Sequence, residues 1–497
     1  MTATEVLVVG AGMSGLRQAA DLAAAGIDFL VLEKAADLGG TWRDNTYPDA
    51  SCDVESDLYS YARDRNPRWS STYATQPEIL AYLRDVARRR GLRPSIRFGT
   101  EVTGARWQAD SGTWVVSTSA GATYTSRFLV LGVGGLHTPK VPDLPGVFEG
   151  YAWHSSRWNH DVDLTGKRVA LVGVGASGVQ LVPHLAERAA ALTVFQRTPA
   201  WVLPKADAPV SAWRKRLFRL LPWAQSLHRL RIYLRREKRG LGFHHRPDAL
   251  AAAEPVVLRQ IAAQVDDPEL RDKLTPRYRL GCKRVLFSNE YYPALNRANV
   301  HVVAGGPTAL RPRAVVDETG NEHEVDVVVY ATGFDVTGSF HHIEVEGVDG
   351  RLLSDVWRTG ASTYQGVAVS GFPNAFLLLG PHSAVPYTGA VVTIEAQSRY
   401  VVRAIRAVRA AGAVALVVRP EAERRFQEWL RRKFARTIWA VGGCRTWYHD
   451  DSPAGTVLYP GSTLAYRRLL RSVRLRDYEL TTDPATAVHR EPLREKR

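Results

Sequence analysis

Two glycine-rich loops in the chain have the residue spacing that can hold the pyrophosphate of a dinucleotide. In the first, Gly10, Gly12 and Gly15 follow the apolar run at residues 6–9. The second repeats the spacing with Gly173, Gly175 and Gly178. The first glycine of such a loop permits a tight turn, the second lets the pyrophosphate approach, and the third lets the helix pack on the strand. Unpaired N–H groups at the helix start then face the phosphates. An ordinary strand–turn–helix is the alternative.

The residue after the next strand distinguishes the two loops. Glu33 ends the apolar run at 29–32, at the distance where an acid accepts hydrogen bonds from an adenosine ribose. After the run at 192–195 there is no acid, and Arg197 and Thr198 stand near that position. An arginine there accommodates a 2′-phosphate, which points to NADPH, although an exposed arginine without a partner is the alternative. Two loops imply two dinucleotides, one of them FAD, with hydride passing between them.

A carboxylate and two adjacent cations complete the candidate chemistry. Trp42 follows Gly39 and Gly40 and can flank a flat ring, which favours a flavin in the first loop. Asp53 lies just beyond, and a carboxylate buried beside a ring needs a cation, so we expect an arginine from elsewhere in the chain. Lys283 and Arg284 interrupt an apolar stretch. Neighbouring side chains on an extended segment point opposite ways, so one could hold a phosphate while the other faces the flavin. A turn aspartate and a solvated Lys–Arg pair are the alternatives.

The elements that must position these residues follow a βαβ pattern. Helical patterns at 16–25 and 79–90 flank the strand pattern at 29–32, and four close strand patterns predict a small antiparallel insert, at 96–98, 105–107, 114–117 and 123–131. The fold class is therefore α/β, with two Rossmann-like dinucleotide-binding domains and a helical insertion in the NADPH domain. We expect an FAD domain at 1–147 and 327–480, an NADPH domain at 148–205 and 278–326, the insertion at 206–277 and a loose tail at 481–497. The strand pattern at 326–330 is expected to return the chain to the FAD domain.

The insertion is the most basic part of the chain. The segments at 213–221 and 227–234 are amphipathic and helical, and Pro222 and Gly240 are expected to divide them. We expect these helices to pack on the nucleotide domain and to line a substrate entrance. A helix lying on a membrane surface is the alternative. Two further helices are predicted at 391–410 and 420–434.

Length and composition exclude several classes of protein. The 497 residues carry a net charge of +15 and are 45% hydrophobic, which suits a globular protein of two to four domains. No nucleic-acid motif accompanies the arginines, and no apolar run is long enough to span a membrane. The N-terminus lacks the pattern of a signal peptide, and three widely spaced cysteines, Cys52, Cys282 and Cys444, suit a reducing compartment. We therefore predict a cytoplasmic protein with no nucleic-acid partner, no membrane span and no metal site.

Residues 148–159 carry a motif that neither helical nor strand periodicity explains, Phe-x-Gly-x-x-x-His-x-x-x-Trp. This motif and its position between the two loops resemble the signature of the type I Baeyer–Villiger monooxygenases, which are class B flavoprotein monooxygenases. The resemblance runs from Val6 to about Asp477. In this motif Asn159 stands where Pro or Asp is usual. The segment at 39–53 resembles a second motif of the family, with Asp49 where Gly or Met is usual. We interpret the segment as the hinge between the two cofactor sites, with His154 and Trp158 setting domain geometry.

The resemblance also implies roles for single residues. Arg284 would be the active-site arginine and Asp53 its carboxylate partner, while Lys283, Arg197 and Thr198 would bind the 2′-phosphate of NADPH. Val385, Pro386 and Tyr387 would line the substrate pocket. The two cofactors are further expected to contact Ser14, Lys34, Gly40, Thr41, Trp42, Val54, Tyr59, Gln76, Val102, Ala176, Ser177, Ala331, Thr332 and Gly333.

The reaction that the resemblance implies fits these residues. NADPH would reduce FAD, and the reduced flavin would react with O2 to give a C4a-peroxyflavin that attacks a ketone and yields an ester or lactone. Arg284 would supply a fixed cation near the developing negative charge. Oxygenation of a nitrogen or sulfur nucleophile is one alternative. A flavoprotein that senses redox state or reduces disulfides is another, although no closely spaced cysteine pair supports the reductase.

Overall fold

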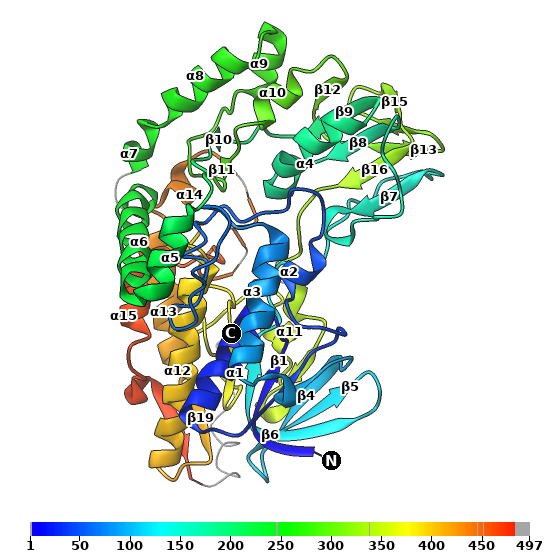
Figure 1. Ribbon diagram of the computed structural model, residues 1–497. Helices are drawn as coiled ribbons and strands as arrows, with labels where there is room; N and C mark the ends of the chain where they lie inside the picture. Colours follow the sequence, from blue (N-terminus) through cyan, green and yellow to red (C-terminus); the bar gives the residue numbers. More distant parts are fainter. Residues whose placement is uncertain (1, 245–246, 337, 445, 451, 483–497) are drawn as a thin grey trace.

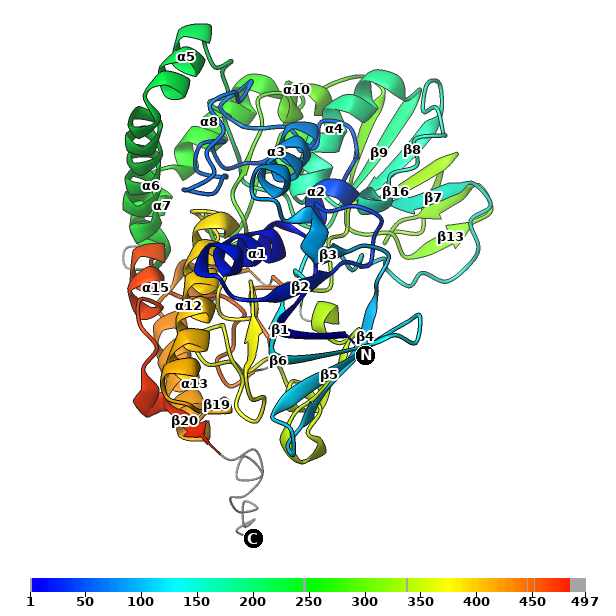
Figure 2. The same cartoon turned by 60° about the horizontal axis from the view of Figure 1, so that its bottom comes forward.

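The computed structural model describes residues 2–244, 247–336, 338–444, 446–450 and 452–482. Its larger sheet has eight strands. At its parallel centre β1 pairs with both β2 and β6 (Figure 1 and Figure 2). The path along the sheet is β17 (Glu344–Glu346), β4 (Val102–Gln108), β5 (Thr113–Thr118), β6 (Thr123–Leu131), β1 (Thr2–Val9), β2 (Phe29–Leu32) and β3 (Ile96–Arg97), with β18 (Ala375–Leu377) on β6. Apolar side chains of β1, β2 and β6 are buried, as expected for strands covered on both faces.

The second sheet is wholly parallel and lies beside the first (Figure 1). Its order is β12 (Val300–Ala304), β9 (Ala191–Gln196), β8 (Arg168–Val172), β16 (Val327–Tyr330) and β7 (Tyr151–His154). A small antiparallel sheet extends from it through β13 (Ala309–Arg311), β14 (Ala314–Val316) and β15 (Glu322–Glu324). Two short pairs complete the strands: β10 (Val202–Leu203) with β11 (Leu286–Phe287), and β19 (Ala415–Val418) with β20 (Tyr478–Thr481).

Helices cover both sheets. α1 (Met13–Ala25) and α12 (Ala390–Ala410) pack against each other through buried apolar faces beside the first sheet. The others near it are α2 (Thr41–Asp44), α3 (Gln76–Arg89), α11 (Leu353–Val356), α13 (Pro420–Phe434) and α15 (Thr463–Leu469). The short helix α14 (Ile438–Val441) instead contacts the helical insertion. α4 (Ala176–Arg188) and α10 (Tyr291–Leu295) pack on the second sheet. The predicted α/β fold with two glycine-loop units is therefore confirmed.

The insertion is helical and follows the left side and the top of the molecule in the view of Figure 1. Its helices are α5 (Ala212–Leu220), α6 (Pro222–His244), α7 (Pro247–Ala251), α8 (Glu254–Gln264) and α9 (Pro268–Leu274). Pro222 begins α6, where its missing N–H costs nothing. Gly240 does not divide the segment, because it lies inside α6 with the ring of Tyr387 against it. A Cβ at Gly240 would lie 2.2 Å from that ring, so glycine permits a close approach there.

Two sequence-based boundaries were wrong. β3 pairs in parallel with β2, so it belongs to the parallel part of the sheet, and the antiparallel part contains only β4, β5 and β6 of the four predicted strands. β16 lies between β8 and β7 in the second sheet, so the chain does not return to the first domain at residue 327. A short buried strand has the same apolar pattern in either sheet, so periodicity could not show to which sheet β16 belongs. The predicted tail at 481–497 lies, beyond residue 482, outside the described residues.

The connection between the sheets is a double crossing of the chain. Pro139 and Phe334 form an antiparallel bridge, and the Lys140 N–H donates to the Gly333 carbonyl at 2.9 Å. The segment at 148–159 lies beside this crossing and forms the edge strand β7 and the short turn after it. His154 packs edge-on against Phe334, with ring centroids 5.4 Å apart. The segment therefore borders the crossing without itself being the connection.

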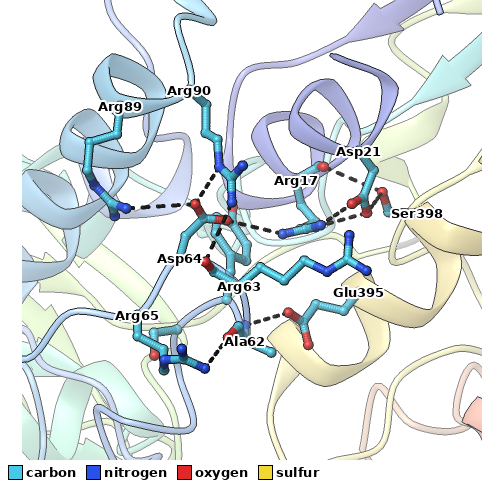
Figure 3. A network of polar contacts seen from close by, with 12 residues as sticks. Arg17, Asp21, Ala62, Arg63, Asp64, Arg65, Arg89, Arg90, Glu395 and Ser398 are labelled. Carbon is cyan, nitrogen blue, oxygen red and sulfur yellow. Dashed lines mark hydrogen bonds and ion pairs between the residues drawn. The ribbon is translucent and has the colours of Figure 1, made fainter. Parts of the chain in front are cut away.

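A network of buried charges fixes helices α1, α3 and α12 around the first sheet (Figure 3). The Arg17 Nε donates to Asp21 at 2.9 Å, and its Nη1 donates to Asp64 at 3.4 Å. Ser398 on α12 donates to Asp21 at 2.7 Å, and Arg90 donates to Asp64 at 2.6 Å. Burial opposes the charge of Arg17, but its hydrogen bonds and ion pairs hold its pKa above the ordinary value.

The cysteines do not all remain separate. Cys282 and Cys444 form a disulfide, with Cα atoms 6.1 Å apart, and Cys52 is free and buried. The expectation of three isolated thiols was therefore wrong. Cys282 and Cys444 are 162 residues apart, so no local sequence pattern indicated that they would meet. The bond ties the segment before Lys283 and Arg284 to the loop after α14.

Candidate active site

The first glycine loop leaves the start of α1 open to a ligand. Gly10 has φ +97°, and a Cβ there would lie 2.8 Å from the Gly132 carbonyl oxygen. Gly12 precedes α1, and the helix has no side-chain cap. Gly40 approaches from the facing loop, where a Cβ would lie 3.1 Å from the Gly12 Cα. Backbone N–H groups and a narrow space between two glycines fit a pyrophosphate.

Glu33 lies buried at the end of β2, beside this loop. Its carboxylate accepts hydrogen bonds from the Ala11 N–H at 2.7 Å, the Ala35 N–H at 3.0 Å and Arg43 Nη1 at 3.1 Å. A carboxylate has about four acceptor positions, so Glu33 can still accept from a ribose hydroxyl. Of the other predicted contacts, Ser14 is buried in the first turn of α1, Lys34 is exposed after Glu33, and Val102 begins β4.

The second glycine loop repeats this geometry on the second sheet. Gly173 has φ +100°, and a Cβ there would lie 2.8 Å from the Ala331 carbonyl oxygen. Gly175 precedes α4, which also lacks a side-chain cap, and a Cβ at Gly175 would meet open space. The predicted contacts Ala176 and Ser177 lie in the first turn of α4, so the helix start is free to face phosphates.

Arg197 and Lys283 lie close enough to influence each other. Burial and the charge of Arg197 both lower the pKa of Lys283. Over the part of the chain that the structure describes, neither cation has a carboxylate within 4.0 Å. Thr198 follows Arg197 beyond the end of β9. Two neighbouring cations without a counter-ion fit a phosphate ligand such as the 2′-phosphate of NADPH.

Asp53 and Arg284 form a bidentate ion pair although 231 residues separate them. The Arg284 Nε donates to Oδ2 at 2.9 Å, and Nη2 donates to Oδ1 at 2.7 Å. Burial alone would raise the pKa of Asp53, but the charge and hydrogen bonds of Arg284 and the charge of Arg236 lower it below its ordinary value. The charge of Asp53 in turn raises the pKa of Arg284, against the effect of burial. Both groups are therefore ionised at neutral pH.

The Arg284 side chain is partly accessible to solvent. Although the pair is surrounded by protein atoms, 44% of the Arg284 side chain is accessible. Its Nη1 makes no hydrogen bond to any residue in the described ranges. One edge of the guanidinium is thus fixed by Asp53, and the other can donate to a ligand.

Gln76, Trp42 and Tyr59 meet beside the first loop. Gln76 begins α3 and donates from its side-chain amide to the Trp42 carbonyl oxygen. The Trp42 indole N–H donates to the Tyr59 hydroxyl at 3.1 Å, and the two rings pack edge to face. Of the remaining first-loop predictions, Thr41 begins α2, and Val54 is buried next to Gly389.

The predicted pocket loop lies under helix α6. Tyr387 is buried, and its hydroxyl and the His244 Nε2 form a hydrogen bond at 2.9 Å. Phe243 stacks on the same ring, with centroids 5.4 Å apart. Val385 is also buried, and Pro386 is half-buried. The insertion therefore covers the loop at 385–387, as expected if both belong to one pocket.

Ala331, Thr332 and Gly333 follow β16 and were expected to contact a cofactor. The Ala331 carbonyl oxygen closely approaches Gly173 of the second loop, and Thr332 donates to the Lys140 carbonyl oxygen. The three residues therefore lie at the double crossing between the two sheets. The structure places them nearer to the second glycine loop than the sequence pattern suggested.

Sequence reasoning missed Arg236, which reaches the site from α6. Its Nη2 donates to the Asp53 carbonyl oxygen at 3.0 Å, its Nη1 to the Tyr387 carbonyl oxygen at 2.9 Å, and its Nε to Glu55. Gln180 was also missed: it accepts from Tyr47 at 2.8 Å and donates to the Ser51 carbonyl oxygen at 3.0 Å, joining α4 to the loop before Asp53. Arg236 is one of many arginines in the insertion, so no sequence signal marked it.

The backbone at Asp49 explains one departure from the expected pattern. Asp49 has φ +61°, in the left-handed region where glycine is least strained. Aspartate tolerates this region better than most residues. Asp49 therefore adopts a backbone conformation that glycine would also adopt here.

No three His, Cys, Asp or Glu side chains converge as metal ligands anywhere in the described ranges. In that same part of the chain, no helix is long and apolar enough to cross a membrane.

Comparison with known proteins places the chain in a class and then in a family. Residues 7–225 match the family described as pyridine nucleotide-disulphide oxidoreductase, which agrees with the paired dinucleotide loops. A Baeyer–Villiger monooxygenase of Pseudomonas aeruginosa is 41% identical over 491 residues, which cover 98% of this chain and 93% of that protein. The chain therefore belongs to the Baeyer–Villiger monooxygenases, and the suspected resemblance is confirmed.

Solved structures support the same assignment. The closed crystal structure of cyclohexanone monooxygenase has a TM-score of 0.87 at 30% identity and covers 97% of this chain and 99% of that one. A crystal structure of OTEMO in complex with FAD and NADP has a TM-score of 0.87 at 30% identity, with 97% and 100% coverage.

Proposed function

We propose that this Baeyer–Villiger monooxygenase converts a small ketone into an ester or lactone at the site that contains Arg284 and Asp53. The balanced reaction consumes the ketone, O2, NADPH and a proton and yields the ester, NADP⁺ and water. The observation that carries the proposal is the Arg284–Asp53 pair, in which Asp53 fixes one edge of an accessible guanidinium and leaves Nη1 free to donate. The family membership of the whole chain supports it.

FAD and NADPH fit the two glycine loops described above. Gly10, Gly12, Gly15 and Glu33 would hold FAD, and Trp42, Tyr59 and Gln76 lie where they could border its ring. Gly173, Gly175 and Gly178 would hold the NADPH pyrophosphate, with Arg197, Thr198 and Lys283 at the 2′-phosphate. When bound, the two cofactors supply hydride transfer and the activation of O2.

Arg284 would stabilise negative charge as it develops in the reaction. An arginine does not titrate in the working pH range, and a cation already in place costs no reorganisation. Such a preorganised donor is worth about 3–4 kcal/mol. Asp53 orients Arg284, and Arg236 holds the Asp53 backbone against the pocket loop. Val385, Pro386 and Tyr387 would limit the size of the ketone and keep water out.

The predicted domains and location belong to the same proposal. The first sheet would form the FAD domain and the second the NADPH domain, with the second crossing after Tyr330. We place the protein in the cytoplasm, as its composition suggests. The test counts the reactive thiols of denatured protein that was prepared without reductant. If all 3 cysteines react, the chain is fully reduced and lacks the Cys282–Cys444 bond, as expected for a cytoplasmic protein.

The test is a product screen. The purified enzyme with FAD is supplied with NADPH and O2 and offered a panel of linear, cyclic and aryl ketones beside amines and sulfides. Mass-resolved esters or lactones carrying one atom from ¹⁸O2 support the proposal. Efficient amine or sulfide oxidation with no ester from any ketone would assign the site to heteroatom oxygenation.

A further inference from the structure

The outer face of helix α6 carries a continuous apolar stripe. Trp223, Leu227, Leu230, Leu234 and Leu241 follow one another at intervals of three, four or seven residues, so they lie on one side of the helix. They are between 41% and 64% exposed. The inner face of the same helix is packed, since Ile232 and Tyr233 lie in the main core and Arg236 contacts Asp53. The stripe is thus held rigidly outward by a well-anchored helix.

Helix α5 adjoins α6 at the edge of the molecule (Figure 2) and also carries exposed apolar side chains. Trp213 is 68% exposed and Leu220 63%. Large exposed apolar side chains are common singly, but a contiguous group marks a contact surface. The outer surface of α5 and α6, defined by Trp213, Leu220, Trp223, Leu227, Leu230, Leu234 and Leu241, is called the outer helical surface below.

Basic side chains flank the outer helical surface. Arg216, Arg219, Arg231 and Lys238 are exposed beside it, and none has a carboxylate within 4.0 Å in the part of the chain that the structure describes. Glu237, the one acid on α6, is already hydrogen-bonded by Thr463. The surface therefore combines leucines, tryptophans and uncompensated cations.

We propose that the outer helical surface docks on an anionic lipid bilayer. Helices that lie in a membrane interface have apolar side chains that include tryptophan on one face and lysine or arginine beside them. Tryptophan prefers the level of the lipid headgroups, and the cations would meet the anionic headgroups. The net charge of +15 favours the same partner. The protein would bind peripherally, with the Tyr387 loop on the inner side of the docked helix.

Charge distinguishes a bilayer from a second copy of the chain. The leucine spacing would also suit a helix pair between two copies. Such a pair would bring Arg231 and Lys238 of one copy near the same cations of the other, and α6 has a single acid, Glu237, to set against its many cations. An anionic bilayer satisfies the apolar stripe and the cations together.

The experiment is sedimentation of the FAD-loaded enzyme with vesicles of phosphatidylcholine alone or of phosphatidylcholine with phosphatidylglycerol. We expect binding to the anionic vesicles that weakens at high salt. Each Lys or Arg near such a surface changes binding by about fivefold, so Arg231→Glu with Lys238→Glu should weaken it by roughly 25-fold or more. Trp223→Ser with Leu230→Ser should also abolish it.

Control variants near the second sheet, away from α5 and α6, test for effects of charge and hydrophobicity alone. Arg188→Glu with Arg297→Glu makes the same change in net charge, and Val147→Ser removes another exposed apolar side chain. These should bind vesicles like the parent, and all variants should keep the parent's turnover of a dissolved ketone. Equal binding by the test and control variants, or none by the parent, overturns the proposal. A dimer that Trp223→Ser with Leu230→Ser dissolves, without vesicle binding, assigns the surface to a second copy.

Discussion

Two arginine–aspartate clusters in this molecule contain the same bidentate contact but differ in how far the arginine is exposed. Arg17 is 3% exposed and bonds to both Asp21 and Asp64, in a network closed by Ser398 and Arg90 (Figure 3). Arg284 has Asp53 as its acidic partner and keeps 44% of its side chain accessible. One guanidinium is enclosed, and the other is fixed along one edge with the opposite edge free.

This difference in exposure assigns different roles to the two clusters, folding to the enclosed one and chemistry to the open one. A buried ion pair need not stabilise a fold by itself, but removing one partner leaves an uncompensated charge in the interior. The enclosed cluster therefore matters for folding. The open pair has an accessible, permanently charged donor, which is the arrangement required to stabilise charge that develops on a ligand.

The largest expected effect is on the enclosed cluster. Arg17→Ala leaves Asp21 and Asp64 buried with reduced compensation, so we expect unfolding to become easier by about 3–5 kcal/mol. Thermal and denaturant unfolding of the FAD-loaded protein measure the change. Arg88→Ala is the control, because Arg88 lies on the surface of α3 and pairs there with Asp85. It should cost less than about 1 kcal/mol. Equal losses in both variants would show that the enclosed cluster has no special role.

The next effect is on the open pair. Arg284→Ala should lower the rate of ester formation by about 100–1,000-fold, since a preorganised donor to developing charge is lost. FAD content should change little. The unfolding temperature should fall, because Asp53 loses its bidentate partner, but by less than in Arg17→Ala, because Asp53 is 19% accessible and keeps the nearby charge of Arg236. Arg284→Lys keeps a cation but loses the bidentate contact, so its rate of ester formation should lie between those of the parent and Arg284→Ala. An unchanged oxygenation rate in Arg284→Ala would remove this residue from the mechanism.

The two clusters were not equally predictable from the sequence. Residue types showed that Asp53 needs a cation, but only resemblance to a family paired it with Arg284. Arg17 gave no signal at all, since its partners lie at positions 21 and 64 and the closing serine at 398. Glycine loops and the strands beside them were predicted well because local sequence dictates them. Contacts across long separations, such as Cys282 with Cys444 or Arg236 with Asp53, depend on packing that no local pattern records.

The disulfide sharpens the comparison, because it lies beside the open pair and far in sequence from the enclosed one. Cys282→Ser with Cys444→Ser removes a cross-link over 162 residues, and disulfides typically contribute about 2–4 kcal/mol. The unfolding temperature should fall. A reducing agent should lower it equally in the parent and leave the double variant unchanged. Sensitivity of the double variant to the reductant would contradict this account.

Arg197 extends the comparison to a second accessible cation. Arg197→Ala removes a charge-assisted contact with the 2′-phosphate, worth about 1.5–3 kcal/mol. The KM for NADPH should rise roughly 10–100-fold, while the KM for NADH, which has no 2′-phosphate, should change little. Steady-state kinetics with both nucleotides measure this. Equal changes in the two constants would show that the 2′-phosphate lies elsewhere.

The smallest expected effect is the response of the open pair to pH. Arg284 lowers the pKa of Asp53 in the folded protein, so this carboxylate stabilises the fold above its unfolded pKa of about 4. That contribution is lost only as the pH falls through the pKa that Asp53 has in the folded protein, which is the lower of the two. The difference in unfolding temperature between the parent and Asp53→Asn should therefore stay constant from about pH 5 to pH 9 and shrink below about pH 4. If this difference varied between pH 5 and pH 9, the Asp53–Arg284 pair would be gaining or losing a proton in the working range. Arg284 would then not be a permanent cation. The contrast between the open pair and the enclosed cluster would fail.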